Sequence, residues 1–137
     1  MPGEILLDPA GQFWFGGAPC IRREITDLFF EHLEGDAVGG YRIRLGRETA
    51  PVIVLGAPLR VWNLLPGEDG VTLVLDGGLT EPLDPTTFRF EGDVPWCRAR
   101  GLDARFTPTA ALALADCLEH DDRGSYLPCA GGVGLRL

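Results

Sequence analysis

The sequence contains no lysine, so all 12 of its basic residues are arginine. It also has only two histidines and four cysteines, and no pair of cysteines is spaced as C-x-x-C. Metal sites and thiol redox motifs need closely spaced ligands, so we predict no metal site and no cofactor. The cysteines are expected to be free thiols. The lack of lysine has two explanations, GC-rich codon usage or selection for bidentate anion recognition, and codon usage is the simpler one.

Long apolar runs are also missing, and none approaches the roughly 20 residues of a membrane-spanning helix. The first residues lack the basic stretch and apolar run of a signal peptide, so a cytoplasmic location is expected. Acidic residues outnumber basic ones by 20 to 12, which gives a formal net charge of -8. This excess disfavours non-specific binding to nucleic acid or to anionic lipid, and we expect neither partner.

Two short apolar runs, at residues 4–7 and 12–15, flank the strong turn signal Asp8-Pro-Ala-Gly11 and predict a β-hairpin. The segment from Ile21 to Glu34 then predicts an amphipathic helix, because its apolar residues recur at helical spacing. The residues of this apolar stripe are Ile21, Ile25, Leu28, Phe29 and Leu33.

From Tyr41 onward the apolar period changes to two, which is typical of half-buried strands. The predicted strands cover residues 41–45, 51–55, 59–65, 71–75, 87–90 and 96–100. A second helix is predicted from about Pro108 to His120, with Thr107 as N-cap and Pro108 at the first helical position. A closing hairpin is expected around Gly131-Gly132.

This order of elements predicts an α+β fold with mostly antiparallel strands. No linker composition divides the chain, so residues 1–137 are expected to form one compact domain. Sliding the sequence on itself by 85 residues aligns both helices without a gap, together with Tyr41 and Tyr126. We therefore predict two similar half-domains with one helix each, covering approximately residues 1–65 and 66–137.

Catalytic constellations are not evident. Ser125 lies outside any G-x-S-x-G motif, and Cys117, three residues before His120, is expected in the core. An enzyme is therefore not the favoured interpretation. A deep cleft lined by Cys117 and His120 would instead favour a hydrolase.

Arginine is concentrated at the start of the first helix and on the predicted strands. Arg22 lies where unpaired backbone N–H groups already favour anions. Arg98 and Arg100 are expected on one strand face, so duplicated halves could present several guanidinium groups to a phosphate or carboxylate. The alternative is that each arginine pairs with one of the surplus surface carboxylates.

Several segments resemble a bacterial family of unknown function, domain-of-unknown-function family 1285. The similarity begins at Gly11-Gln-Phe-Trp14 and Gly17-Ala-Pro-Cys-Ile-Arg22 and continues through Tyr41-Arg-Ile and Leu55-Gly-Ala-Pro-Leu59. Its most specific part is Pro95-Trp-Cys-Arg-Ala-Arg-Gly-Leu-Asp-Ala-Arg105. The resemblance implies a duplicated α+β fold whose second half is loosely pleckstrin-homology-like. It also implies an unproven role in signalling, through a nucleotide-like ligand held between the halves.

The sequence departs from the family pattern at Leu45-Gly46, where the family has Thr-Pro, and at Asp103, which replaces a glutamate. The chain is also shorter than usual members.

The main hypothesis is a small anionic ligand, in a sensor or binding module. Trp14 would supply a stacking surface, Arg22, Arg98 and Arg100 would contact the anion, and Tyr41 and Asp103 would orient polar groups. The other hypothesis is a protein-interaction or structural domain without a small ligand, whose exposed strand Tyr41–Leu45 would pair with a protein partner or a second copy.

Overall fold

The computed structural model describes residues 4–68, 70–128 and 134–136 of the chain. The first part of the chain forms β1 (Ile5–Leu7), β2 (Phe13–Phe15), β3 (Ala18–Pro19), α1 (Arg23–Glu31), β4 (Leu33–Gly35), β5 (Tyr41–Leu45) and β6 (Glu48–Val54). The middle part forms β7 (Leu59–Gly67), β8 (Gly70–Leu75), η1 (Asp76–Gly78), β9 (Thr80–Pro82), η2 (Pro85–Thr87), β10 (Arg89–Glu91), β11 (Val94–Ala99) and β12 (Leu102–Phe106). The last part forms α2 (Pro108–Cys117), β13 (Glu119–Asp121), β14 (Gly124–Pro128) and β15 (Gly134–Arg136).

The first half is a six-stranded sheet in the order β3-β2-β1-β6-β5-β4, with α1 against one face. All neighbouring strands are antiparallel except β1 and β6, which run parallel. Phe13 of β2 is fully buried under the helix, with its ring centroid 5.3 Å from that of Phe29 and 4.7 Å from that of Phe30. These aromatic contacts fix α1 on the sheet.

Helix α1 is shorter than the sequence predicted, and the face it presents to the core is shifted, although Phe29 and Leu33 of the predicted stripe do pack inside. It ends at Glu31, because the Leu33 segment leaves the helix and pairs as β4 with Ile43. Phe30, which lay outside the predicted stripe, is its buried residue, and Leu28 is exposed. Ile21, also expected in the core, is 84% exposed. The apolar stripe of α1 is therefore wider than the surface that the sheet covers.

The second half contains a sheet in the order β10-β11-β12-β7-β8-β9, in which only β12 and β7 are parallel neighbours. Helix α2 packs against β7 and begins as predicted, since the Thr107 hydroxyl accepts a hydrogen bond from the backbone N–H of Ala110. Its end at Cys117 comes three residues earlier than predicted, where the chain turns into β13.

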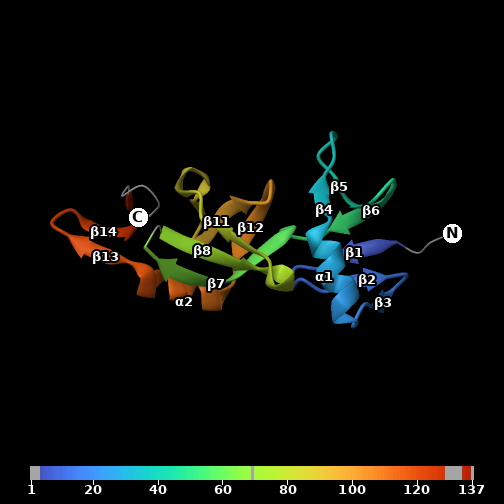
Figure 1. Cartoon of the computed structure of the whole chain (residues 1–137), viewed down its shortest axis with the longest axis horizontal. Coiled ribbons are helices and arrows are strands. Elements are labelled where there is room, and N and C mark those ends of the chain that lie inside the picture. Colours follow the sequence, from blue (N-terminus) through green and yellow to red (C-terminus); the bar gives the residue numbers. More distant parts are fainter. Residues whose placement is uncertain (1–3, 69, 129–133, 137) are drawn as a thin grey trace.

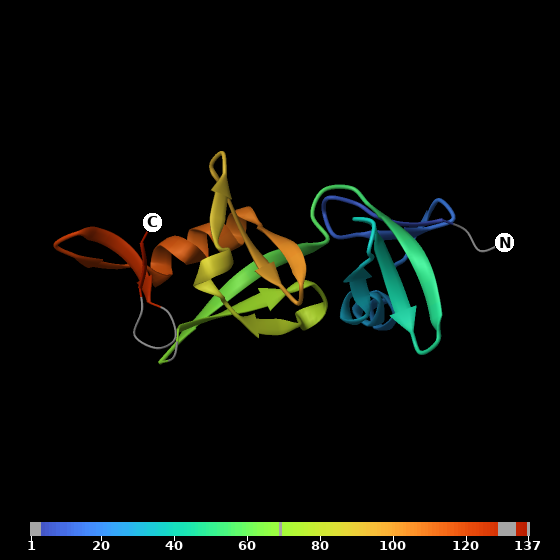
Figure 2. The ribbon, with the colours of Figure 1, turned by 90° about the horizontal axis from the view of Figure 1, so that it is seen from above.

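A small third sheet, β13-β14-β15, follows α2. Its β13–β14 hairpin lies at the end of the molecule farthest from the first half (Figures 1 and 2). The turn expected around Gly131-Gly132 lies outside the described residues. Helix and strand order repeat along the chain: β2-β3-α1-β4-β5-β6 corresponds to β11-β12-α2-β13-β14-β15, close to the 85-residue offset. The predicted duplicated α+β fold is therefore confirmed.

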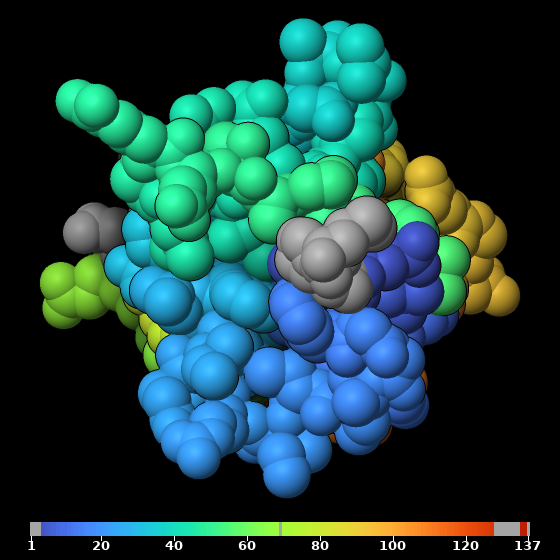
Figure 3. Space-filling view, turned by 90° about the vertical axis from the view of Figure 1, so that its right-hand side faces the viewer, coloured from blue at the N-terminus to red at the C-terminus, as the bar shows by residue number. Residues whose placement is uncertain are grey.

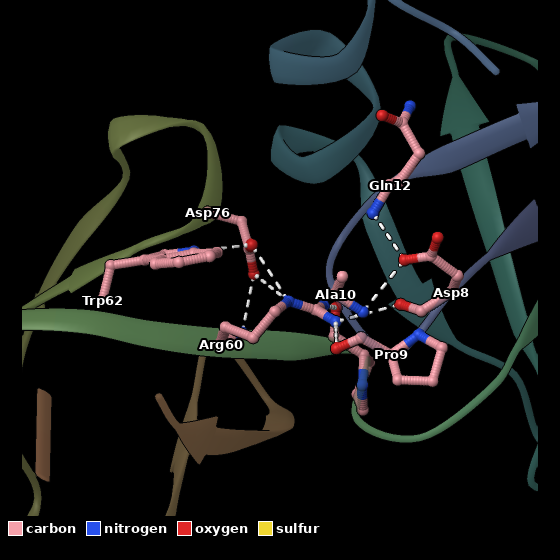
Figure 4. A network of polar contacts seen from close by, with 8 residues as sticks. Asp8, Pro9, Ala10, Gln12, Arg60, Trp62 and Asp76 are labelled. Carbon is pink, nitrogen blue, oxygen red and sulfur yellow. Dashed lines mark hydrogen bonds and ion pairs between the residues drawn. The ribbon is translucent and has the colours of Figure 1, made fainter. Parts of the chain in front are cut away.

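The two large sheets lie end to end, and the chain passes from one to the other between Val54 and Leu59. In a view from the end formed by the first half, the first half hides most of the second, which is visible only at the rim (Figure 3). The joint between the sheets is where the turn of the first hairpin meets β7 and η1 (Figure 4).

Candidate functional site

A buried ion pair lies at the joint. Arg60 of β7 and Asp76 of η1 are each only 4% exposed. The Arg60 backbone N–H donates to Asp76 Oδ2 at 2.6 Å, and its Nε donates to Oδ1 at 3.0 Å. The Asp76 carboxylate thus pairs with the Arg60 guanidinium and also accepts a hydrogen bond from the Arg60 backbone N–H. These interactions compensate the cost of removing both charges from water.

The remaining donors of Arg60 reach across to the first half. Its Nη1 donates to the carbonyl oxygens of Asp8 and Pro9, both at 3.3 Å, and Nη2 donates to that of Pro58 at 2.9 Å. The turn of the first hairpin is therefore held by a residue more than fifty positions later in the sequence (Figure 4).

Asp8 shapes this turn. Its Oδ1 accepts hydrogen bonds from the backbone N–H groups of Ala10 and Gln12, both at 2.9 Å. Its Oδ2 accepts from the indole N–H of Trp14 at 3.0 Å. Burial raises the pKa of the Asp8 carboxyl, but these bonds and the nearby charge of Arg60 outweigh it and hold the pKa below its usual value. The contribution of Asp8 to stability is therefore present at neutral pH and is lost as the pH falls through that lowered pKa.

Gly11 has no space for a side chain. A Cβ built on it would lie 2.9 Å from Arg60 Nε and 3.0 Å from Asp76 Oδ1, and its φ is +90°. We expect Gly11→Ala to reduce the free energy of unfolding by roughly 2–4 kcal/mol, since left-handed backbone and overpacking each cost about 1–3 kcal/mol. Urea denaturation measures the loss. Gly17→Ala is the matched control, because Gly17 has a φ of +85° and no neighbouring atom within 4 Å of its Cβ position. An equal loss in both variants would contradict the steric part of the prediction.

Beside the ion pair lies a groove of about 610 Å³ between the halves. Its walls come from the first hairpin turn, from β7, the β10–β11 turn, β11 and β12, and from the start of α2. They are Pro9, Ala10, Arg60, Trp62, Asp93, Val94, Pro95, Arg105, Phe106, Thr107, Pro108, Thr109 and Ala111. Trp62 is 44% exposed, and its indole N–H donates to Asp76 Oδ1 at 2.9 Å. The bond fixes one edge of the ring, so the indole forms a rigid apolar wall.

Arginines are gathered on the outer face of the second-half sheet. The strand register places Arg89, Trp96, Arg105 and Arg60 in one row across four strands. Arg89 stacks on the Trp96 ring, 5.3 Å from its centroid, and pairs with Asp103 at 3.6 Å. Arg60 is paired with Asp76. Arg105 is exposed and forms no ion pair or side-chain hydrogen bond within the part of the chain that the structure describes.

The structure brings together three of the six residues predicted from the sequence. Tyr41, Arg98 and Asp103 line a smaller pocket of about 160 Å³ between the halves. Arg98 Nη1 donates to Asp103 Oδ1 at 3.2 Å, and Nη2 donates to the carbonyl oxygen of Gly101. The guanidinium in this pocket thus already has partners.

The other three predicted residues lie apart from this pocket. Trp14 lies on the outer face of the first sheet, beside Leu6, and Arg22 is exposed and paired with Glu24 at 3.5 Å. Arg100 lies in the β11–β12 turn with a φ of 54°, and its Nη2 donates to the Glu31 carbonyl oxygen at the end of α1, at 3.1 Å. The predicted arginines therefore do not converge on one ligand position.

Sequence reasoning missed the residues of the groove. The exposure of Arg105 could have been predicted. The segment Leu102-Asp-Ala-Arg-Phe106 alternates with period two, which places Arg105 on the exposed face of a strand. The burial of Arg60 could not, because a buried arginine and an exposed one on alternating strands look alike in sequence. Trp62 is the unpaired residue of a bulge in the pairing of β7 with β8, which no local pattern indicated.

Nucleophiles outside the groove lack catalytic surroundings. Ser125 Oγ lies 2.9 Å from His120 Nδ1, but the pair is exposed on the β13–β14 hairpin. Burial raises the pKa of Cys97 to about 12, with Glu81 adding to the shift, so its thiol is unreactive at neutral pH. No group of side chains suited to holding a metal ion occurs in residues 4–68, 70–128 and 134–136. Across the same residues, no helix has the length and apolar character needed to cross a bilayer.

The fold and the joint together define a class of protein: two α+β half-domains, duplicated in tandem, that meet around a buried arginine. No protein-family model and no curated protein matches the sequence.

Solved structures do match. The chain is similar to a DUF1285 family protein from Silicibacter pomeroyi DSS-3, with a TM-score of 0.77 and 17% identity over 98% of this chain and 79% of that one. It is also similar to a DUF1285 family protein from Shewanella baltica OS155, with a TM-score of 0.67 and 16% identity over 77% of this chain and 85% of that one. The fold is therefore that of DUF1285 family proteins, as the resemblance in sequence predicted.

Proposed function

We propose that the protein is a non-enzymatic binding module for a small organic anion, held in the groove between the half-domains. The ligand would have one phosphate or carboxylate group and a flat apolar body, so a nucleotide is among the candidates. Arg105 and Trp62 would be its main contacts, in place of the residues predicted from the sequence.

The observation that carries the proposal is the free guanidinium of Arg105. In a chain with eight excess negative charges, most arginines have a nearby carboxylate. Arg105 lines the groove and forms no ion pair among the described residues, although the Asp93 carboxylate lines the same groove. Beside Arg105 the Thr109 hydroxyl adds a donor, and the dipole of α2 favours a negative group at its start.

The apolar part of the groove supports the second half of the proposal. Trp62, Val94, Pro95 and Phe106 are among the apolar residues of its wall. A rigid indole face is a common stacking surface for planar ligands. A concave, mostly apolar groove with a few polar groups is the usual form of a small-molecule site.

The proposal is tested by calorimetry and thermal shift with phosphate, phenylphosphate, benzoate and AMP as probes. Phenylphosphate or AMP should bind more tightly than inorganic phosphate, because only they reach Trp62. Arg105→Ala should weaken binding by roughly 10- to 100-fold, since a hydrogen bond to a charged group contributes about 1.5–3 kcal/mol. Trp62→Ala should weaken phenylphosphate and leave phosphate unchanged.

Arg47→Ala is the matched control, because Arg47 is also exposed and also lies without an ion-pair partner in the described chain, but outside the groove. Its affinity for every probe should equal that of the wild type. Binding that resists Arg105→Ala, or no binding of any probe, would overturn the proposal.

A further inference from the structure

The two copies of the duplicated unit differ in one strand pairing. In the first half, β1 pairs in parallel with β6 and joins the two hairpins into one continuous sheet. This pairing buries the core-facing side chain of β1, so Ile5 is only 7% exposed.

The corresponding strands of the second half do not pair. By the 85-residue offset, β10 corresponds to β1 and β15 corresponds to β6. Each is instead the terminal strand of its own sheet among the described residues. Phe90 of β10 is 50% exposed, although its strand partner Pro95 is buried. Among the described strands, the second half therefore leaves open an edge that the first half closes.

An additional group of strands accounts for the difference. The β7-β8-β9 meander extends the second sheet beyond β12, and α2 packs on β7. The strands that follow α2 are thus carried away from β10 (Figure 2). Leu127 of β14 is fully buried and belongs to the main core cluster, so the third sheet is anchored where it lies.

Backbone hydrogen-bonding groups of β10 point outward at the open edge. Glu91 and Val94 flank a two-residue turn, so each donates a backbone hydrogen bond to the other. In an antiparallel pair such hydrogen-bonded positions alternate with positions that are not hydrogen-bonded. The next two residues, Phe90 and Pro95, are therefore not hydrogen-bonded to each other. This fits the absence of an N–H on Pro95. The N–H and C=O of Phe90 therefore face away from β11.

The same alternation applies to β15. Asp121 and Gly124 flank a two-residue turn and form a hydrogen-bonded pair. By alternation, the backbone of Tyr126 bonds to β13, and the backbone of Leu127 bonds to Leu135 of β15. The N–H and C=O of Arg136 therefore face away from β14. Unpaired edges of this kind are templates for pairing with another chain.

We propose that β15 of one chain pairs with β10 of a second copy, and that the reciprocal pairing closes a two-fold dimer. The partner strand would be added as β6 is added to β1 in the first half, with its side chains over Phe90. We assign the partner strand to a second copy because β15, the counterpart of β6, cannot reach β10 of its own chain. A second copy supplies the same strand.

Light scattering over a concentration series, with native mass spectrometry, tests the proposal on the full chain. The wild type should form a concentration-dependent dimer. Phe90→Pro and Arg136→Pro each remove one outward N–H and should each make the protein monomeric. A mixture of the two variants should regain a dimer, because Arg136→Pro supplies an intact β10 and Phe90→Pro supplies an intact β15.

Matched alanine variants separate backbone pairing from side-chain loss. Phe90→Ala and Arg136→Ala keep the N–H, so dimers should persist, and circular dichroism verifies that all four variants fold. Ile21→Ser removes an exposed apolar side chain that precedes α1, away from β10 and β15, and should leave the dimer intact. A monomeric wild type, a dimer that survives both proline variants, a mixture that stays monomeric, or a dimer lost in Ile21→Ser would overturn the proposal.

Discussion

Replacing Asp76 with alanine is expected to lower the free energy of unfolding by about 3–5 kcal/mol, because it leaves the Arg60 guanidinium buried without a counter-charge. Asp76 also accepts the Arg60 backbone N–H and the Trp62 indole N–H. These donors lose their partner as well. Since domains are typically stable by only 5–15 kcal/mol, a loss of this size removes a large part of the total. Urea denaturation followed by circular dichroism measures it.

The ion pairs of Glu34 with Arg42 and Arg44 are the control, because all three side chains are more than a third exposed. Glu34→Ala should leave the unfolding midpoint almost unchanged, since solvent screens exposed pairs. The double variant Arg60→Met with Asp76→Leu should recover part of the stability, because it removes both buried charges together. A full loss in the double variant would assign the effect to lost hydrogen bonds, including those that Asp76 accepts from the residue-60 and Trp62 N–H groups, and not to the unpaired charge.

Phe13→Ala is expected to have the second large effect, a loss of about 3–5 kcal/mol through the cavity it leaves in the first-half core. The side chain is fully buried and packs against Phe29 and Phe30. Without it, α1 loses its main contact with β2. Loss of the near-ultraviolet dichroism of the aromatic cluster, with a lowered midpoint in urea, is the measurement.

Phe15 provides the comparison, because it lies on the same strand and is 45% exposed. Phe15→Ala should cost much less than Phe13→Ala, since much of its surface is already in contact with water. Equal losses would show that strand propensity, and not burial, determines the effect.

Much of the fold could be predicted from the sequence, because local chemistry determines it. Thr107 and Pro108 mark the start of α2, and Asp8-Pro-Ala-Gly11 marks the first turn. The buried face of α1 could not be predicted. Leu28 and Phe30 are both apolar, and only contact with Phe13 decides that Phe30 is the one inside.

The candidate site could be predicted only in its general character. Arginine on neighbouring strands does mark the second-half sheet, but the sequence pointed to Arg98 and Arg100, which the structure shows bound to carbonyl oxygens. Whether an arginine is free depends on which carboxylates lie near it in space. Arg60 and Asp76 are separated by sixteen positions, so the pairing that sets Trp62 at the groove is a tertiary property.

The bonds from Arg60 to the Asp8 and Pro9 carbonyl groups have a consequence for synthesis of the chain. The amino-terminal turn leaves the ribosome long before β7, and its two carbonyl groups stay hydrated until residue 60 emerges. Asp76 must follow before the guanidinium can be buried with its counter-charge. Burial of this turn is thus delayed until residue 76 has been synthesised, although every strand of the first sheet precedes residue 55, and water supplies the hydrogen bonds of the two carbonyl groups during that interval.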